Sequence, residues 1–239
     1  MITFAIMSTT WKQSGQQLVY TIINPLIKGL IKAGITPNMI TFLGLVINVA
    51  ATVILIYGAE YGERNDHTYV AWGGLTILLA GLMDMIDGRL ARIGGMSNDY
   101  GALFDSVLDR YSEMVMFLGI CYYLISYDYF LSSLFAFIAM IGSIMVSYTR
   151  ARAEGLGVNC SVGIMQRPER ILIIGITAIF CGCFSYFYGG DFKIDVDWLP
   201  FPLFETITLF TFPIFLLSIF TNITAVNRLL HSKKELQNT

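Results

Sequence analysis

The sequence predicts an all-α membrane protein, a polytopic bundle of six transmembrane helices with an N-terminal amphipathic interfacial helix. Of its 239 residues, 55% are hydrophobic and only 13% are charged, and the mean hydropathy is +0.64. This composition is too apolar for an ordinary soluble domain. Polar segments divide the chain into six apolar stretches, each long enough to cross a bilayer about 30 Å thick. The basic residues gather on one side of these stretches, as in polytopic membrane proteins.

The N-terminal part is expected to stay outside the bilayer. Residues 1–16 are predicted to be a short tail, and residues 17–33 form a helix that is apolar on one side, with Lys28 and Lys32 four positions apart. We expect this helix to lie at the membrane interface, with Pro25 bending or breaking it. A soluble helix that packs on the body of the protein is the alternative. Residues 34–230 are predicted to form the membrane domain, and residues 231–239 a C-terminal tail.

The first span follows a break at residues 34–38, where Thr36 or Asn38 can cap the helix, and it runs to about residue 58. Pro168 and Glu169 are placed to start the fifth span. Pro213 predicts a kink in the sixth span. The later spans are expected at about residues 69–84, 101–127, 130–148, 171–188 and 203–226.

Charge predicts the orientation of the bundle. Six spans place both termini on one side, and 13 of the 15 lysines and arginines lie on that side, whereas Arg64 and Lys193 lie on the other. Cytoplasmic loops carry the excess of positive charge. We therefore expect an integral protein of the cell inner membrane with both termini in the cytoplasm.

One stretch, residues 84–109, collects four aspartates where two spans meet. In the first half, the aspartates and two small residues share one face of a helix, because they recur at three- and four-residue intervals. In the second half, Gly101, Asp105 and Asp109 form one stripe of the next helix. A glycine-rich turn joins the helices, which predicts antiparallel neighbours with facing aspartates. The full pattern is Asp84-x2-Asp87-Gly88-x2-Ala91-Arg92-x8-Gly101-x3-Asp105-x3-Asp109.

These residue types indicate a cation and an anionic ligand. Crowded carboxylates repel one another unless a cation joins them. All candidate ligands are oxygens, which favours Mg²⁺, Mn²⁺ or Ca²⁺. The small residues Gly88, Ala91 and Gly101 leave room for a ligand close to the backbone, and Arg92 is placed to meet an anion. This combination suits a metal-bound diphosphate. The alternative is a helix pair packed through small residues, with the aspartates in structural ion pairs.

The complete pattern resembles the signature of the CDP-alcohol phosphatidyltransferase family, and the resemblance extends from about Pro37 to Arg170. It implies that Asp84, Asp87 and Asp105 hold a divalent metal, Mg²⁺ or Mn²⁺. It also implies that Asp109 is the general base and touches a metal as well. The implied CDP-binding residues are Asn38, Thr41, Gly88, Ala91, Arg92 and Gly101.

The resemblance also implies the reaction and the partners. A phosphatidyl group would pass from CDP-diacylglycerol to the hydroxyl of a polar alcohol, CMP would leave, and the active site would face the cytoplasm. The family leads us to expect a homodimer in the membrane, with no nucleic-acid partner.

Four arginines near the ends of the fourth and fifth spans predict a phosphate on the acceptor: Arg150, Arg152, Arg167 and Arg170. Arginine forks bind phosphate bidentately. The alternative is that these arginines only mark the cytoplasmic side of the membrane and do not bind the acceptor. Residues 147–157 and 163–170 resemble prokaryotic phosphatidylinositol-phosphate synthases, which implies inositol 1-phosphate as the acceptor. A phosphatidylglycerophosphate synthase acting on glycerol 3-phosphate is the alternative within the family. Glu113, one turn after Asp109, is expected to pair with Arg110, and the alternative is that it orients a residue of the aspartate pattern.

An ion transporter is the alternative from another class, since intramembrane carboxylates are typical of ion paths. The aspartates, however, lie at one level on two helices beside arginines that would oppose the passage of a cation. We therefore favour the transferase.

Overall fold

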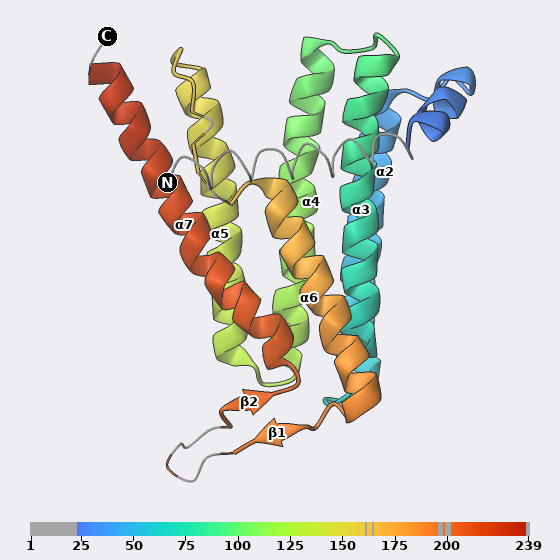
Figure 1. Cartoon of the computed structure of the whole chain (residues 1–239), viewed down its shortest axis with the longest axis vertical. Coiled ribbons are helices and arrows are strands. Elements are labelled where there is room, and N and C mark those ends of the chain that lie inside the picture. The colour runs from blue at the N-terminus through green and yellow to red at the C-terminus, as the bar shows by residue number, and fades with distance from the viewer. Residues whose placement is uncertain (1–22, 161, 164, 196–197, 199–201, 238–239) are drawn as a thin grey trace, which may run out of the picture.

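The computed structural model describes residues 23–160, 162–163, 165–195, 198 and 202–237. These residues form a bundle of long helices with a small hairpin at the end opposite the aspartates (Figure 1). The helices are α2 (Pro37–Tyr61), α3 (Thr68–Ile93), α4 (Asp99–Ser126), α5 (Phe130–Glu154), α6 (Arg167–Tyr188) and α7 (Thr208–Gln237). The hairpin pairs β1 (Lys193–Ile194) with β2 (Phe204–Glu205) in antiparallel register.

The predicted membrane helix bundle is confirmed. Within the described residues, five helices are long and apolar enough to cross a membrane: α2, α3, α5, α6 and α7. Helix α4 is as long as these, but Asp99, Asp105, Asp109, Arg110 and Glu113 make its first half charged. A sixth span at α4 therefore stays a prediction.

Several helices extend beyond the apolar stretches that predicted them. Helix α3 continues through the aspartates to Ile93, and α5 continues past Tyr148 to Glu154. Helix α7 begins at Thr208 rather than near residue 203, and it includes most of the predicted C-terminal tail. Polar residues end a span but not a helix, because they leave the backbone ladder intact. Gly157, whose positive φ of 80° favours glycine, follows the end of α5.

The helices pack in pairs, α2 with α3 and α4, α3 with α6, and α5 with α7. Glycines allow the close crossing of α3 and α6: a Cβ atom at Gly74 would lie 2.8 Å from the carbonyl oxygen of Gly175. One continuous apolar core runs through the bundle and includes the fully buried Phe117, Tyr123 and Phe210. This packing fixes the positions of α3, α4 and α6 at the end of the bundle that holds the aspartates, hereafter the polar end.

Residues 23–32 are helical and pack beside the polar end. Ile23 and Ile27 are buried against Ile86 and Leu90 of α3, whereas Lys28 and Lys32 are exposed. The helix is therefore amphipathic, as predicted, and its apolar face covers the bundle. The rest of the predicted interfacial helix, residues 17–22, and the predicted tail, residues 1–16, lie outside the described residues.

Candidate active site

The α3–α4 turn brings the aspartates together. Carboxylate oxygens of Asp84, Asp105 and Asp109 all lie within 4.8 Å of one another. Asp87 lies beside them, and its Oδ2 accepts a 2.7 Å hydrogen bond from Thr41 Oγ1 of α2. Asn98 caps α4, because its Oδ1 accepts a 2.7 Å hydrogen bond from the backbone N–H of Gly101. This cap fixes the start of the helix that carries two of the aspartates.

The cluster fits a divalent cation. Its donors are carboxylate oxygens, which Mg²⁺ and Mn²⁺ prefer. Asp105 Oδ1 is buried and accepts no hydrogen bond within the described part of the chain. An unpaired buried carboxylate oxygen is costly, and a bound cation would satisfy it. Asp84, Asp105 and Asp109 would hold such an ion, with Asp87 beside them.

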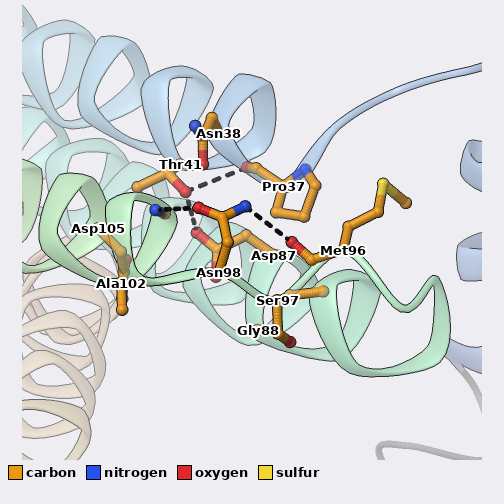
Figure 2. A pocket seen from close by; sticks show the side chains of 12 residues that line it. Pro37, Asn38, Thr41, Asp87, Gly88, Met96, Ser97, Asn98, Ala102 and Asp105 are labelled. Atoms are coloured by element: carbon orange, nitrogen blue, oxygen red, sulfur yellow. Dashed lines mark hydrogen bonds between the residues drawn. The ribbon is translucent and has the colours of Figure 1, made fainter.

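On one side of the cluster lies a cavity of about 230 Å³, hereafter the glycine pocket (Figure 2). A side chain at Gly101 would enter it, since a Cβ atom there would lie 3.4 Å from the Oδ1 atoms of Asn38 and Asn98. Arg92 does not line this cavity; its Nε donates to the carbonyl oxygen of Gly88 at 2.9 Å, at the edge of the pocket. The lining includes the other five predicted CDP-binding residues: Asn38, Thr41, Gly88, Ala91 and Gly101. It also includes residues that we did not predict: Pro37, Met96, Ser97, Asn98 and Ala102.

On the other side lies a cavity of about 180 Å³ between α4, α5, α6 and α7, hereafter the arginine pocket. Its arginines are Arg110, Arg150, Arg167, Arg170 and Arg228. Asp109 lines this pocket and Asp105 lines the glycine pocket. One helical turn of α4 therefore separates the two cavities, and the aspartate cluster lies between them.

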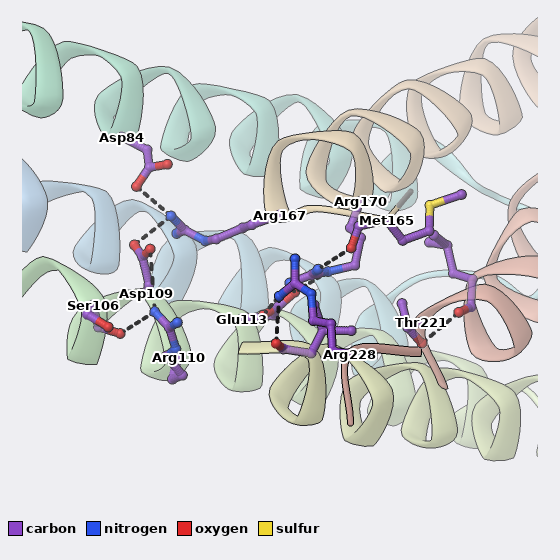
Figure 3. A network of polar contacts seen from close by, with 12 residues as sticks. Asp84, Ser106, Asp109, Arg110, Glu113, Met165, Arg167, Arg170, Thr221 and Arg228 are labelled. Atoms are coloured by element: carbon purple, nitrogen blue, oxygen red, sulfur yellow. Dashed lines mark hydrogen bonds and ion pairs between the residues drawn. The ribbon is translucent and has the colours of Figure 1, made fainter. Parts of the chain in front are cut away.

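Arg167 joins the arginine pocket to the aspartates. Its Nη1 atom lies 2.5 Å from Asp84 Oδ1 and 2.5 Å from Asp109 Oδ1 (Figure 3). The guanidinium therefore neutralises part of the crowded negative charge. Arg167 enters this position from the first turn of α6, which begins with the Arg167-Pro168-Glu169 sequence.

Arg170 is buried in an ion pair that the sequence did not predict. Its Nε and Nη2 atoms donate to Glu113 at 2.8 Å and 3.0 Å, and its Nη1 donates to the carbonyl oxygen of Met165 at 2.9 Å. Arg170 is 1% exposed. The predicted Glu113–Arg110 pair is therefore wrong: Arg110 Nη1 instead donates to the carbonyl oxygen of Ser106, and it lies 3.7 Å from Asp109 Oδ2. The Glu113–Arg170 pair fixes the loop before α6, and hence the position of Arg167.

The structure places the other two predicted arginines apart. Arg150 lines the arginine pocket and pairs with Glu154 at 2.8 Å on an exposed surface. Arg152 was expected in the same site, but it lies on the outer side of α5 and lines a different groove. Side chains two residues apart on a helix point in directions about 200° apart, so Arg150 and Arg152 cannot share one pocket.

Arg228 of α7 was not among the arginines that we predicted from the sequence to bind a phosphate. It is 3% exposed, and its Nε and Nη1 atoms each donate at 2.7 Å, to the carbonyl oxygens of Val162 and Val146. Within the described part of the chain it has no carboxylate partner. A buried intramembrane charge indicates a candidate functional site, and a guanidinium suits an anion such as phosphate.

The fold and the site together define a polytopic membrane protein that has an acidic centre for a divalent cation between a small-residue cavity and a cationic cavity. The model of the CDP-alcohol phosphatidyltransferase family matches residues 34–224. The chain therefore belongs to the CDP-alcohol phosphatidyltransferases, and it is a membrane-integral transferase of phospholipid synthesis. The resemblance stated from the motif is confirmed.

Two similar proteins are named as synthases of inositol-containing lipid phosphates. The phosphatidylinositol phosphate synthase of Mycobacteroides abscessus is 34% identical over 166 residues, which cover 69% of this chain and 71% of that protein. The archaetidylinositol phosphate synthase of Pyrococcus horikoshii is 35% identical over 155 residues, which cover 64% and 74%.

Solved structures share the fold. The crystal structure of Mycobacterium tuberculosis phosphatidylinositol phosphate synthase with CDP-DAG bound has a TM-score of 0.68 and 27% identity, and it matches 89% of this chain and 94% of that chain. The same enzyme in complex with manganese and citrate has a TM-score of 0.65 and 26% identity over 87% of each chain.

Proposed function

We propose that this protein transfers a phosphatidyl group from CDP-diacylglycerol to a hydroxyl of inositol 1-phosphate and releases CMP. The observation that carries the proposal is the order of the three sites. A cavity lined by small residues, an aspartate cluster and an arginine pocket follow one another at the polar end of the bundle. A CDP group, a scissile phosphate and an acceptor phosphate need sites in that order.

In this proposal the glycine pocket holds the CDP moiety. Gly88, Ala91 and Gly101 let the ligand approach the backbone, and Asn38 and Thr41 offer polar contacts at its wall. Arg92, at the edge of the pocket, supplies positive charge for the diphosphate. The two acyl chains would lie in the lipid beside the bundle.

The aspartates and the arginine pocket would perform the transfer. A bound divalent cation supplies Lewis-acid stabilisation of charge on the diphosphate. Asp109 lines the arginine pocket, so it is placed to take the proton of the acceptor hydroxyl as that oxygen attacks the lipid-linked phosphorus. The bond from that phosphorus to the CMP oxygen breaks, and CMP carries away the negative charge.

The acceptor phosphate would bind to Arg150, Arg167 and Arg228 in the arginine pocket, which Arg110 also lines. Buried Arg228 supports this assignment most strongly, because it has no carboxylate partner among the described residues. We assign Arg170 a positioning role, since its guanidinium is already paired with Glu113. An acceptor without a phosphate would leave Arg228 without an anion among the described residues.

We also propose that the aspartates and both termini face the cytoplasm of a cell inner membrane and that the protein is a homodimer. The distribution of lysine and arginine supports this orientation. Cysteine labelling from either side of the membrane, and cross-linking in native membranes, test these two points.

The function is tested by giving the purified protein CDP-diacylglycerol, Mg²⁺ or Mn²⁺, and separate acceptors. The acceptors are inositol 1-phosphate, glycerol 3-phosphate, inositol and serine, and the lipid product is identified by mass. We expect phosphatidylinositol phosphate from inositol 1-phosphate and no product from inositol or serine. Preferential use of glycerol 3-phosphate would instead identify a phosphatidylglycerophosphate synthase.

A further inference from the structure

A groove on the outer surface of α5 and α7 takes no part in the proposed reaction. Its volume is about 550 Å³, within the range of about 300–1,000 Å³ that ligand pockets occupy. It lies where both helices approach the end of the bundle that carries the aspartates (Figure 1). Its apolar wall includes Tyr148, Leu156, Leu229 and Leu230, and its cations are Arg152 and Lys233.

The groove combines two features that call for one ligand. The apolar side chains of Tyr148, Leu156, Leu229 and Leu230 are exposed. Arg152 and Lys233 are also exposed, and within the described residues neither makes an ion pair. An apolar surface with two free cations at the polar end of transmembrane helices suits an anionic lipid, because such basic pockets bind acidic head groups.

We propose that this groove binds an anionic glycerophospholipid of the surrounding bilayer. One acyl chain lies along the leucines, and the phosphate group lies against Arg152 and Lys233. A free phosphate ion would leave the apolar wall exposed to water, whereas a zwitterionic lipid would bring its own cation towards these two. The groove therefore selects a lipid with net negative charge.

A second copy of the chain fits the groove less well. A two-fold interface brings the same patch of each subunit together. Arg152 and Lys233 of one subunit would then approach the same cations of the other, and like charges at an interface oppose association.

The bound lipid would also support the arginine pocket. Ser147 and Arg150 of α5 and Arg228 of α7 line that pocket, and their sequence neighbours Tyr148, Thr149 and Leu229 line the groove. The two cavities therefore lie on opposite sides of the same helical turns. A lipid that fills the groove holds α5 and α7 together behind the arginine pocket. The proposal rests on these contacts and not on the identity of the acceptor.

The test is native mass spectrometry of the full-length protein titrated with phosphatidylglycerol or phosphatidylcholine of identical acyl chains. One lysine or arginine near an anionic lipid contributes about 1 kcal/mol, which is about fivefold in affinity. We expect tighter binding of phosphatidylglycerol to the wild type and about a fivefold loss in Lys233→Gln and in Arg152→Gln. Lys234→Gln is the matched control, because Lys234 is the next residue, is exposed and does not line the groove.

Equal binding of the two lipids by the wild type would overturn the proposal, and so would equal losses in Lys233→Gln and Lys234→Gln. A change in the monomer–dimer equilibrium without a change in lipid binding would identify the groove as a protein interface and would also overturn it. A second variant, Leu230→Asn, tests the apolar wall: it should weaken both lipids alike, and unchanged binding would contradict the placement of the acyl chain.

Discussion

The buried pair of Glu113 and Arg170 gives a prediction that can be worked out from the structure. Both side chains are almost fully buried, 3% and 1% exposed, and the shortest nitrogen–oxygen distance between them is 2.7 Å. Glu113→Gln would leave the guanidinium of Arg170 charged and buried without a counter-charge. Removing one partner of a buried pair costs about 3–5 kcal/mol. At about 2–4 °C per kcal/mol for a chain of this size, the melting temperature should fall by about 6–20 °C.

A thiol-reactive dye can measure this change in detergent. Cys160 and Cys181 are buried and react only as the fold opens, while Cys183 is exposed and sets the baseline. Glu154→Gln is the matched control, because it removes the partner of Arg150 at a surface where both side chains are about half exposed. Exposed pairs contribute about 0–1 kcal/mol, so the control should melt close to the wild type.

A double variant separates the cost of burying an unpaired charge from the effect of altered packing on stability. Glu113→Leu combined with Arg170→Met removes both charges at similar volume, and it should be more stable than either single substitution. Equal melting temperatures of Glu113→Gln and Glu154→Gln would contradict this prediction, since they would mean that water reaches the Glu113–Arg170 pair. A double variant no better than the sum of its singles would show that the two charges do not interact.

Three further predictions follow from the site and the fold. Asp109→Asn should abolish CMP release and weaken Mn²⁺ binding, because it removes both the base and one of the three carboxylates that would hold the ion. CMP formation and electron paramagnetic resonance measure the two effects, and full activity would remove Asp109 as the base. Arg228→Gln should raise the KM for a phosphorylated acceptor at least tenfold, because a charged hydrogen bond contributes about 1.5–3 kcal/mol, and it should leave the KM for CDP-diacylglycerol unchanged. Equal changes in both KM values would contradict the assignment of the acceptor phosphate to the arginine pocket. Burial lowers the pKa of His67, which precedes α3 and is 1% exposed. As the pH falls, the unfolded chain therefore takes up the proton first, and the stability of the fold should decrease below about pH 6.5. In His67→Gln the loss of melting temperature between pH 7 and pH 5 should be smaller than in the wild type, and an equal loss would contradict this prediction.

The acidic centre could be predicted from the sequence because its geometry is local. Intervals of three and four residues place Asp84 with Asp87 and Asp105 with Asp109 on helix faces, and the turn between the helices is short. The structure adds the partner of Asp87, the hydroxyl of Thr41, which is 46 residues distant in sequence.

The arginine pocket could be predicted only in part, because it is made by tertiary packing. Arg228 follows an apolar stretch and is the first basic residue of a polar tail, so the sequence gives no sign that it is buried. Only the packing of α7 on α5 brings Arg228 beside Val146. Arg170 and Glu113 are 57 residues apart, and their pairing likewise depends on how α6 meets α4. The position of Arg152 followed from helical geometry once α5 was known to continue past Tyr148.

An anomalous-scattering map from crystals of this protein grown with Mn²⁺ would show directly whether the aspartate cluster holds a metal ion. We expect one peak, or two adjacent peaks, at about 2.0–2.2 Å from carboxylate oxygens of Asp84, Asp105 and Asp109, between the glycine pocket and the arginine pocket. Strong manganese peaks elsewhere, with none at these three side chains in an active preparation, would contradict it.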